Sequence, residues 1–199
     1  MTNINTINKC DWTKFWQKMN PLVWRIYSWF AAYLLLKALK DLKIKSMLEL
    51  GGGSGLVAKH VAKKLEAKLT LMDNDPGAYE AFKRFSNYGE YLREDFFSFQ
   101  TERRWDLVFS LGVIEHFQED KRSEAIRVHQ NFSTKYIFIA VPANSWLRRN
   151  FMAKKPNTAI PFEKLYSLDE LKKESREAGL KPWQSGENIW AVWVLSRIE

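Results

Sequence analysis

The residues best suited to chemistry in this chain form a glycine-rich stretch that an acidic residue precedes. Glu49 stands two positions before Gly51, and Gly53 and Gly55 follow at alternate positions. Glycines at this spacing let the backbone turn tightly and approach a ligand, and a helix that begins after them offers unpaired N–H groups. Gly53 to Ala58 also fits the G-x-G-x-x-A pattern of dinucleotide-binding loops. Glu49, however, suits a ligand with a cationic amino group better than it suits a pyrophosphate.

A second carboxylate ends an apolar run about 20 residues after the glycines, the spacing that sets an acid against a ribose diol. Residues 67–73 form this run, which reads as a buried strand. Asp75 precedes Pro76, a pair typical of a helix N-cap and the first helical position. Asp73 is therefore the predicted ribose ligand.

Two more candidate positions follow later apolar runs. Asp95 and Phe96 come after a short strand expected at residues 90–94, where an acid and a ring can contact an adenine; a plain surface turn is the alternative. Glu115 and His116 lie in the loop after a strand expected at residues 105–111. We expect these loops to meet, because ligands of open α/β sheets gather at the carboxyl ends of the strands.

In order and spacing these stretches resemble the class I S-adenosylmethionine-dependent methyltransferases. Residues 49–55 resemble the acid-x-G-x-G-x-G loop of that family, and residues 69–76 its second strand with the terminal acid. Residues 92–96 are similar to the acid after the third strand, and residues 105–117 to the fourth strand and its exit loop. The resemblance covers roughly residues 44–199. It implies a cofactor, S-adenosylmethionine, held by Glu49, Gly51, Gly53, Gly55, Asp73, Asn74, Asp95, Phe96 and Leu111.

The same resemblance bears on catalysis. His116 is the candidate general base, although many methyl transfers need only aligned reactants. Some relatives hold a divalent metal in an E-x-x-E-H loop, but Gly112 stands where the first acid would be. Glu115 and His116 alone cannot form a three-ligand site, although His60, His129 or an acid elsewhere would complete one. We expect no metal.

Composition sets the broad class. The chain has 199 residues, of which 46% are hydrophobic, enough for the core of a single domain. The lone cysteine, Cys10, excludes an internal disulfide, and the absence of a recognisable secretory signal predicts a cytoplasmic protein. A formal net charge of +8 favours an anionic partner such as a nucleic acid, a phosphorylated metabolite or a membrane surface.

Residues 11–42 are unusually rich in aromatic side chains. A membrane span is rejected because Arg25 and Lys37 interrupt the apolar run, which leaves peripheral membrane contact as an option. Pro21 should separate a short helix from a longer one that ends near Leu39. Three interpretations stay open: an aromatic lid over the acceptor, helices packed on the sheet, or a face on a membrane. The aromatic residues are Trp12, Phe15, Trp16, Trp24, Tyr27, Trp29, Phe30 and Tyr33.

The segment between Pro142 and Ser167 reads as a loop too long for a simple connector. This mixture of aromatic and cationic residues predicts acceptor binding or, equally, a solvated surface. The residues are Trp146, Arg148, Arg149, Phe151, Lys154 and Lys155. Ser167 and Glu170 form a capping box for a helix that Gly179 ends. The alternating residues 189–195 suit an antiparallel hairpin that closes the sheet.

Together with the resemblance, these patterns predict a Rossmann-like α/β domain, residues 44–199, with a seven-stranded, mainly parallel sheet, a C-terminal antiparallel hairpin and an N-terminal helical lid, residues 1–43. The predicted reaction is methyl transfer to a small-molecule or lipid-like acceptor that carries an anionic group. The residues expected to bind that acceptor are Trp16, Tyr27, Trp146, Arg148 and Arg149.

Other functions stay open. RNA or protein methylation would use the basic loop 144–155, but nucleic acid is not favoured because the lysines form no clear stripe. An NAD(P)-dependent oxidoreductase would share the glycine turn and Asp73, but it leaves Glu49 unexplained. A non-catalytic cofactor-binding module is the remaining alternative.

Overall fold

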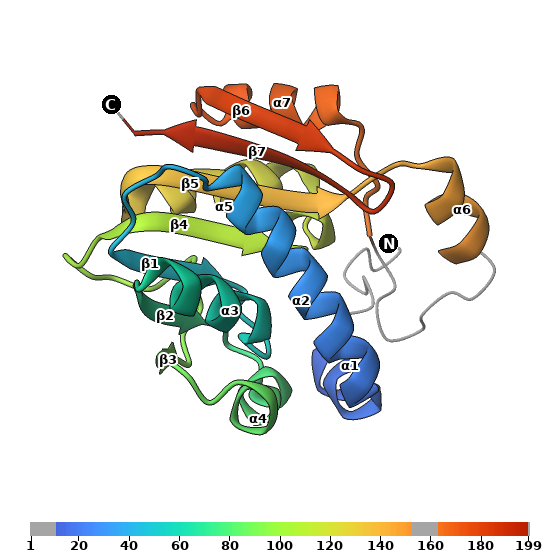
Figure 1. Cartoon of the computed structure of the whole chain (residues 1–199). Helices are drawn as coiled ribbons and strands as arrows, with labels where there is room; N and C mark the ends of the chain where they lie inside the picture. Colours follow the sequence, from blue (N-terminus) through green and yellow to red (C-terminus); the bar gives the residue numbers. More distant parts are fainter. Residues whose placement is uncertain (1–10, 153–162, 199) are drawn as a thin grey trace, which may run out of the picture.

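The structure is a computed structural model that describes residues 11–152 and 163–198, and a seven-stranded sheet forms its centre (Figure 1). The strand order is β3-β2-β1-β4-β5-β7-β6. The first five strands run parallel, and β7 is antiparallel to both of its neighbours. The predicted sheet and C-terminal hairpin are confirmed. The strands are β1 Ser46–Leu50, β2 Lys68–Met72, β3 Glu90–Leu92, β4 Trp105–Leu111, β5 Ser133–Pro142, β6 Pro182–Glu187 and β7 Ala191–Arg197.

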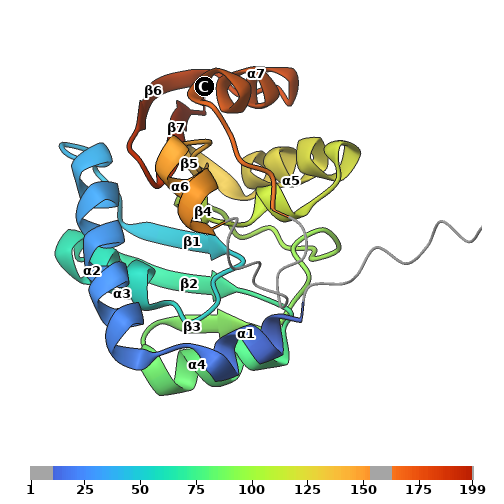
Figure 2. The same ribbon diagram turned by 90° about the vertical axis from the view of Figure 1, so that its right-hand side faces the viewer.

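Helices cover both faces of this sheet, with α2 and α3 on one side and α5 and α7 on the other (Figure 2). The central strands are apolar along their length because both of their faces are buried. In β1, Met47 points toward the α2 and α3 side, whereas Leu48 and Leu50 point toward the other. The helices are α1 Trp12–Lys18, α2 Pro21–Ala38, α3 Leu56–Leu65, α4 Pro76–Phe85, α5 Glu119–Phe132, α6 Trp146–Met152 and α7 Leu168–Glu177, with a 3-10 turn η1 at Ile114–His116.

The N-terminal helices begin where their capping residues predict. The Asn20 side chain accepts hydrogen bonds from the N–H groups of Leu22 and Val23, and Pro21 takes the first position of α2. Asp75 caps α4 in the same way, because its carboxylate accepts from the Ala78 N–H at 2.9 Å. Both predicted boundaries are therefore confirmed.

One face of α2 belongs to the core. Ser28, Ala32, Leu35 and Ala38 are buried there, and three of these four side chains are small. Small residues let α2 approach α3 closely, and Leu35 packs in the same apolar cluster as the residues of α3. Part of the N-terminal segment thus packs on the sheet, as one of the three interpretations expected.

The structure differs from the sequence-based expectation in two connections. The segment between β3 and β4 is too short for a crossover helix, which predicts a thinly covered sheet there, but Phe96, Phe97 and Phe99 pack on the face of the sheet that α5 also covers. The segment predicted as a loop after Pro142 contains α6. The two ends of the segment that contains α6 are joined by a hydrogen bond from the Tyr166 N–H to the Pro142 carbonyl at 2.9 Å. The segment therefore starts and ends beside β5.

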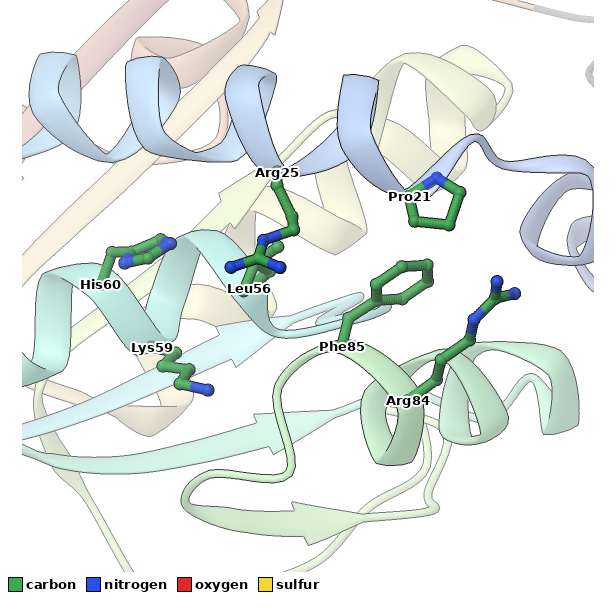
Figure 3. Close-up of a pocket in the computed structure, with 7 residues that line it drawn as sticks. All are labelled: Pro21, Arg25, Leu56, Lys59, His60, Arg84 and Phe85. Atoms are coloured by element: carbon green, nitrogen blue, oxygen red, sulfur yellow. The ribbon is translucent and has the colours of Figure 1, made fainter.

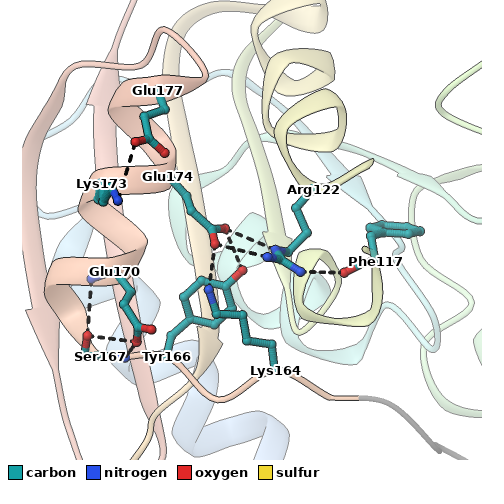
Figure 4. Close-up of polar contacts among 9 residues, drawn as sticks. All are labelled: Phe117, Arg122, Lys164, Tyr166, Ser167, Glu170, Lys173, Glu174 and Glu177. Carbon is teal, nitrogen blue, oxygen red and sulfur yellow. Dashed lines mark hydrogen bonds and ion pairs between the residues drawn. The ribbon is translucent and has the colours of Figure 1, made fainter. Parts of the chain in front are cut away.

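A buried ionic network fixes the loop after β4 to the far helices (Figure 4). Arg122 of α5 donates from Nε and Nη2 to the two carboxylate oxygens of Glu174 on α7, at 3.2 and 3.3 Å, and from Nη1 to the Phe117 carbonyl at 2.9 Å. Lys164 and Tyr166 donate to the same carboxylate. Burial raises the pKa of Glu174, but these donors outweigh it and lower that pKa below 4.5.

We predict that Glu174→Ala lowers the free energy of unfolding by about 3 kcal/mol, because it leaves the buried Arg122 guanidinium without its carboxylate. Glu177→Ala, on the same helix, removes only an exposed contact to Lys173 and should leave that free energy nearly unchanged. Urea unfolding at neutral pH measures both variants. Equal effects of the two substitutions would contradict a structural role for the network.

Candidate functional site

The glycine turn between β1 and α3 takes a backbone form that only glycine adopts without strain. Gly51 and Gly53 have φ values of +66° and +49°. A Cβ on Gly51 would lie 2.6 Å from Cγ2 of Val113, and one on Gly53 would clash with the indole of Trp16. The turn is therefore closely approached by the loop after β4 and by helix α1.

Asp73, at the end of β2, holds this turn in place. Its carboxylate accepts hydrogen bonds from the Gly53 N–H at 2.9 Å and from the Asp75 N–H at 3.0 Å. Burial raises the pKa of Asp73 above its ordinary value, although the two N–H donors oppose that effect. The predicted ribose ligand thus lies directly beside the glycines, and Asn74 follows it at an exposed position.

Glu49 is a buried carboxyl group at the centre of the sheet. Its side chain is 5% exposed, and its Oε2 atom has no hydrogen-bond partner within the part of the chain that the structure describes. Burial raises the pKa of Glu49 well above 4.5, and the negative charge of Asp73 raises it further. A buried acid in this state would ionise if a cation came within reach, because an adjacent positive charge favours the carboxylate. The site therefore fits a ligand with an ammonium group.

Helix α1 crosses the carboxyl edge of the sheet and reaches both sides of the site (Figure 2). The Trp16 indole covers Gly53, and the Thr13 hydroxyl donates to the Asp75 carboxylate at 3.4 Å. At the helix start, the Trp12 ring meets the His116 ring edge-on with 4.9 Å between their centroids. Residues of α1 thus touch the glycine turn, the start of α4 and the loop after β4.

Two aromatic residues that the sequence did not single out for the site support the same turn. Trp24 Nε1 donates to the Ser54 hydroxyl at 2.8 Å, which connects α2 to the glycine loop. The Tyr91 hydroxyl, on β3, donates to the Gly53 carbonyl at 3.3 Å. Burial raises the pKa of Tyr91, and Asp73 and Glu49 add to the effect, so the phenol stays a donor. Neither residue forms a sequence motif; only the fold brings them to the loop.

The predicted adenine contacts, Asp95 and Phe96, are neighbours in the connection after β3. Asp95 accepts from the Phe97 N–H at 3.0 Å, so this acid also forms the turn that the sequence left as the alternative. Phe96 packs against Phe97 and Phe117, with ring centroids 4.5 and 6.1 Å away. Leu111 ends β4 and is half-buried. Their role toward a ligand stays a prediction.

His116 lies at the end of the turn after β4, next to a buried acid. Its Nε2 is 3.7 Å from Oε1 of Glu115, whose side chain is 1% exposed. A protonated His116 would form an ion pair with that carboxylate, and its role as a base stays a prediction. The Trp12 ring also contacts His116, and the His116 side chain is 13% exposed.

The remaining predicted acceptor residues are more dispersed. Tyr27 is exposed on α2 with its ring stacked on Trp24. Trp146 is 70% exposed, and Arg149 donates to the Asn144 side chain at 2.8 Å. Cys10, Lys154, Lys155 and the side chains of Arg148 and Phe151 lie outside the described residues.

Within the described ranges, no group of three or more His, Cys, Asp or Glu side chains is arranged to hold a metal ion. His129, one of the residues considered for such a group, is a core residue: its ring nitrogens contact the Ala125 carbonyl at 2.7 Å and the Ser110 hydroxyl at 3.0 Å. Burial lowers the pKa of His129 to about 4. Of the described helices, none is long and apolar enough to span a membrane.

Residues 23–185 match the model of a protein family described as a methyltransferase domain. No curated protein sequence matches the chain. Among solved structures, magnesium protoporphyrin IX methyltransferase from Synechocystis, with bound S-adenosylhomocysteine, is similar with a TM-score of 0.67 at 13% identity, over 92% of this chain and 89% of that one.

Two further similar structures differ more in length. Human N-acetylserotonin methyltransferase in complex with S-adenosylmethionine has a TM-score of 0.74 at 18% identity, over 93% of this chain and 55% of that one. The other is the 1,6-didemethyltoxoflavin-N1-methyltransferase of Burkholderia thailandensis, with bound 1,6-didemethyltoxoflavin and S-adenosylhomocysteine. It has a TM-score of 0.66 at 15% identity, over 94% of this chain and 82% of that one. This chain thus spans about half of the human protein, and the likeness shows a shared fold.

The raised pKa of Glu49 predicts a pH-dependent stability. Because the unfolded chain releases this proton near pH 4.5 and the folded chain only at higher pH, the ligand-free protein should lose stability as pH rises above about 4.5. Glu49→Gln should flatten this slope and stabilise the protein at neutral pH. Urea unfolding across that pH range tests it, with exposed Glu102→Gln as the control. An unchanged slope in Glu49→Gln would show that Glu49 is already ionised.

Proposed function

The chain belongs to the methyltransferase-domain family whose model matches residues 23–185, and on that premise we propose that it transfers a methyl group from S-adenosylmethionine to a small or lipid-like acceptor. The family predicted from the sequence is confirmed, and so is the Rossmann-like fold class. The individual site residues and the acceptor are the subject of this proposal.

The observation that carries the proposal is the buried Glu49 carboxyl with an oxygen that lacks a partner in the described structure. We assign it to the amino group of the methionine moiety, whose charge would stabilise the carboxylate form. Gly51 and Gly53 carry no Cβ where the ligand's chain would approach the turn, and we assign Asp73 to the ribose hydroxyls. A nicotinamide dinucleotide offers no ammonium group for Glu49, so the oxidoreductase alternative is not favoured.

When bound, the cofactor supplies an activated methyl group with its own leaving group. What the protein adds is position, exclusion of water and control of one proton. Trp16 covers the turn, and Trp12 lies over His116 at the end of the sheet where the methyl group would be. His116 would take the proton of the acceptor, and the buried Glu115 would stabilise its charged form.

A small acceptor agrees with the aromatic character of α1. Binding sites for small ligands are mostly apolar with a few placed polar groups, and Trp12 beside His116 provides such a combination. The similar structures named above are methyltransferases of small molecules by their names. We propose that α1 acts as a lid over this acceptor. An anionic group on the acceptor stays a prediction, because most of the cations expected to bind it lie outside the described side chains.

Asp73→Asn should weaken the binding of S-adenosylmethionine and S-adenosylhomocysteine more than tenfold, about 2 kcal/mol, by removing a charge-assisted hydrogen bond to the ribose. Asp75→Asn is the matched control, since asparagine caps a helix as well as aspartate does. Isothermal titration calorimetry measures both. If only Asp75→Asn weakens binding, the two acids have the opposite roles.

Transfer of a labelled methyl group to pools of small metabolites, lipids, RNA and protein identifies the acceptor, and label in none of them would favour the non-catalytic module.

With the acceptor found, His116→Gln should lower the turnover number by about two to four powers of ten and leave cofactor affinity unchanged. His60→Gln, a histidine on α3, is the control. Turnover of His116→Gln within a few fold of the wild type would end its role as a base.

A further inference from the structure

The outer face of α2 exposes a stripe of large apolar side chains. Leu22, Ile26, Trp29 and Tyr33 follow one another at spacings of four, three and four residues, which places them on one side of the helix. Together with Phe30 they are between 45% and 67% exposed. Of the eleven most exposed large apolar side chains in the described structure, seven belong to this helix. So concentrated an apolar face on a surface helix marks an interaction site.

A basic cavity opens at the start of the same helix, where α2 meets α3 and the end of α4 (Figure 3). Its volume is about 350 Å³. Arg25 reaches into it from α2 and Arg84 extends from α4, with the Phe85 ring between them. The lining residues that matter here are Arg25, Lys59, His60, Arg84, Leu56 and Phe85.

The cavity has a positive potential. None of the described residues that line it is acidic. Burial lowers the pKa of His60, and the charges of Lys59, Lys63 and Arg25 lower it further, so cations dominate the surroundings. Lys59 donates to the Ser86 carbonyl at 2.9 Å, which fixes its ammonium group at the wall and leaves it two further N–H donors. Such a cavity suits a phosphate group.

We propose that α2 docks this protein on an anionic phospholipid surface, with the apolar stripe in the headgroup region and the basic cavity holding a lipid phosphate. Arg25 connects the two features, because it lies on the helix that bears the stripe and lines the cavity. Charge supports a bilayer as the occupant: residues 11–45 contain seven Lys and Arg against two Asp. Aromatic and aliphatic residues flanked by cations are the composition of interfacial helices.

A second copy of the chain would suit this face less well. In a two-fold pair the same surface meets itself, so the cations of one α2 would face the cations of the other. Helix α2 holds Arg25 and Lys37 and has no acidic residue to pair with them. An anionic membrane supplies the missing negative charge. This inference goes beyond the proposed methyl transfer and does not depend on it.

Flotation of the full chain with vesicles tests the proposal. Binding should be weak to phosphatidylcholine vesicles and at least tenfold stronger with about 30% phosphatidylglycerol, and salt should reduce it. Ile26→Ser with Trp29→Ser should lower the partition coefficient about tenfold, and so should Arg25→Ala with Arg84→Ala. The control for the apolar stripe is Ile189→Ser, at an exposed position near the β6–β7 turn. The control for the cations is the double variant Arg127→Ala with Arg176→Ala, on the helices across the sheet. Each control should change the partition coefficient by less than about twofold.

Three results would overturn the proposal. Equal binding to both vesicle types, or to none, removes the anionic surface as partner. Calorimetric binding of inorganic phosphate that Arg25→Ala abolishes, without vesicle binding, would assign the cavity to a free phosphate. Sedimentation showing a dimer that Ile26→Ser with Trp29→Ser dissociates, without vesicle binding, would assign the face to a second copy. Unchanged cofactor affinity and melting temperature in the exposed-face variant establish that it is folded.

Discussion

Two buried carboxyl groups at the ends of adjacent strands set the constraint on which this structure depends. Glu49 on β1 and Asp73 after β2 lie under the same glycine turn, and the charge of Asp73 contributes to the raised pKa of Glu49. Two backbone N–H groups donate to Asp73 and oppose the effect of burial on its pKa, whereas Glu49 receives no such support within the described structure. The fold therefore buries one carboxyl group whose ionisation a bound cation would favour, which is the property expected of a site for an amino group.

The N-terminal helices serve this site in separate ways. Helix α2 presents Ala32 and Leu35 to the core and connects to the turn through the bond from Trp24 to Ser54. Helix α1 packs against α4 and spans from Gly53 to His116. The three interpretations of the aromatic segment therefore concern different surfaces: the inner face of α2 packs on the sheet, α1 is our proposed lid, and the outer face of α2 is our proposed membrane contact.

Much of this was predictable because strand and cap signals are local. The acid at the end of each apolar run, the proline after Asp75 and the capping box at Ser167 are each read from a few neighbouring residues. The contacts of Trp24 and Tyr91 with the glycine turn were not predictable, because they join residues 30 and 38 positions apart that only the packing brings together. The same holds for Arg122, whose partners Phe117 and Glu174 lie in the loop after β4 and on α7. It also holds for the helix α6 inside the long connection.

The central claim is that Glu49 is protonated in the empty site and ionises when the cofactor's amino group binds. Calorimetric titration with S-adenosylmethionine in buffers of different ionisation enthalpy measures the number of protons released on binding. At about pH 6.5 the cofactor's amino group is already protonated, because this pH lies below the ordinary pKa of an α-amino group. The account predicts that the wild type releases a substantial fraction of a proton on binding and that Glu49→Gln releases none. Binding by the wild type without any dependence on the buffer would contradict it.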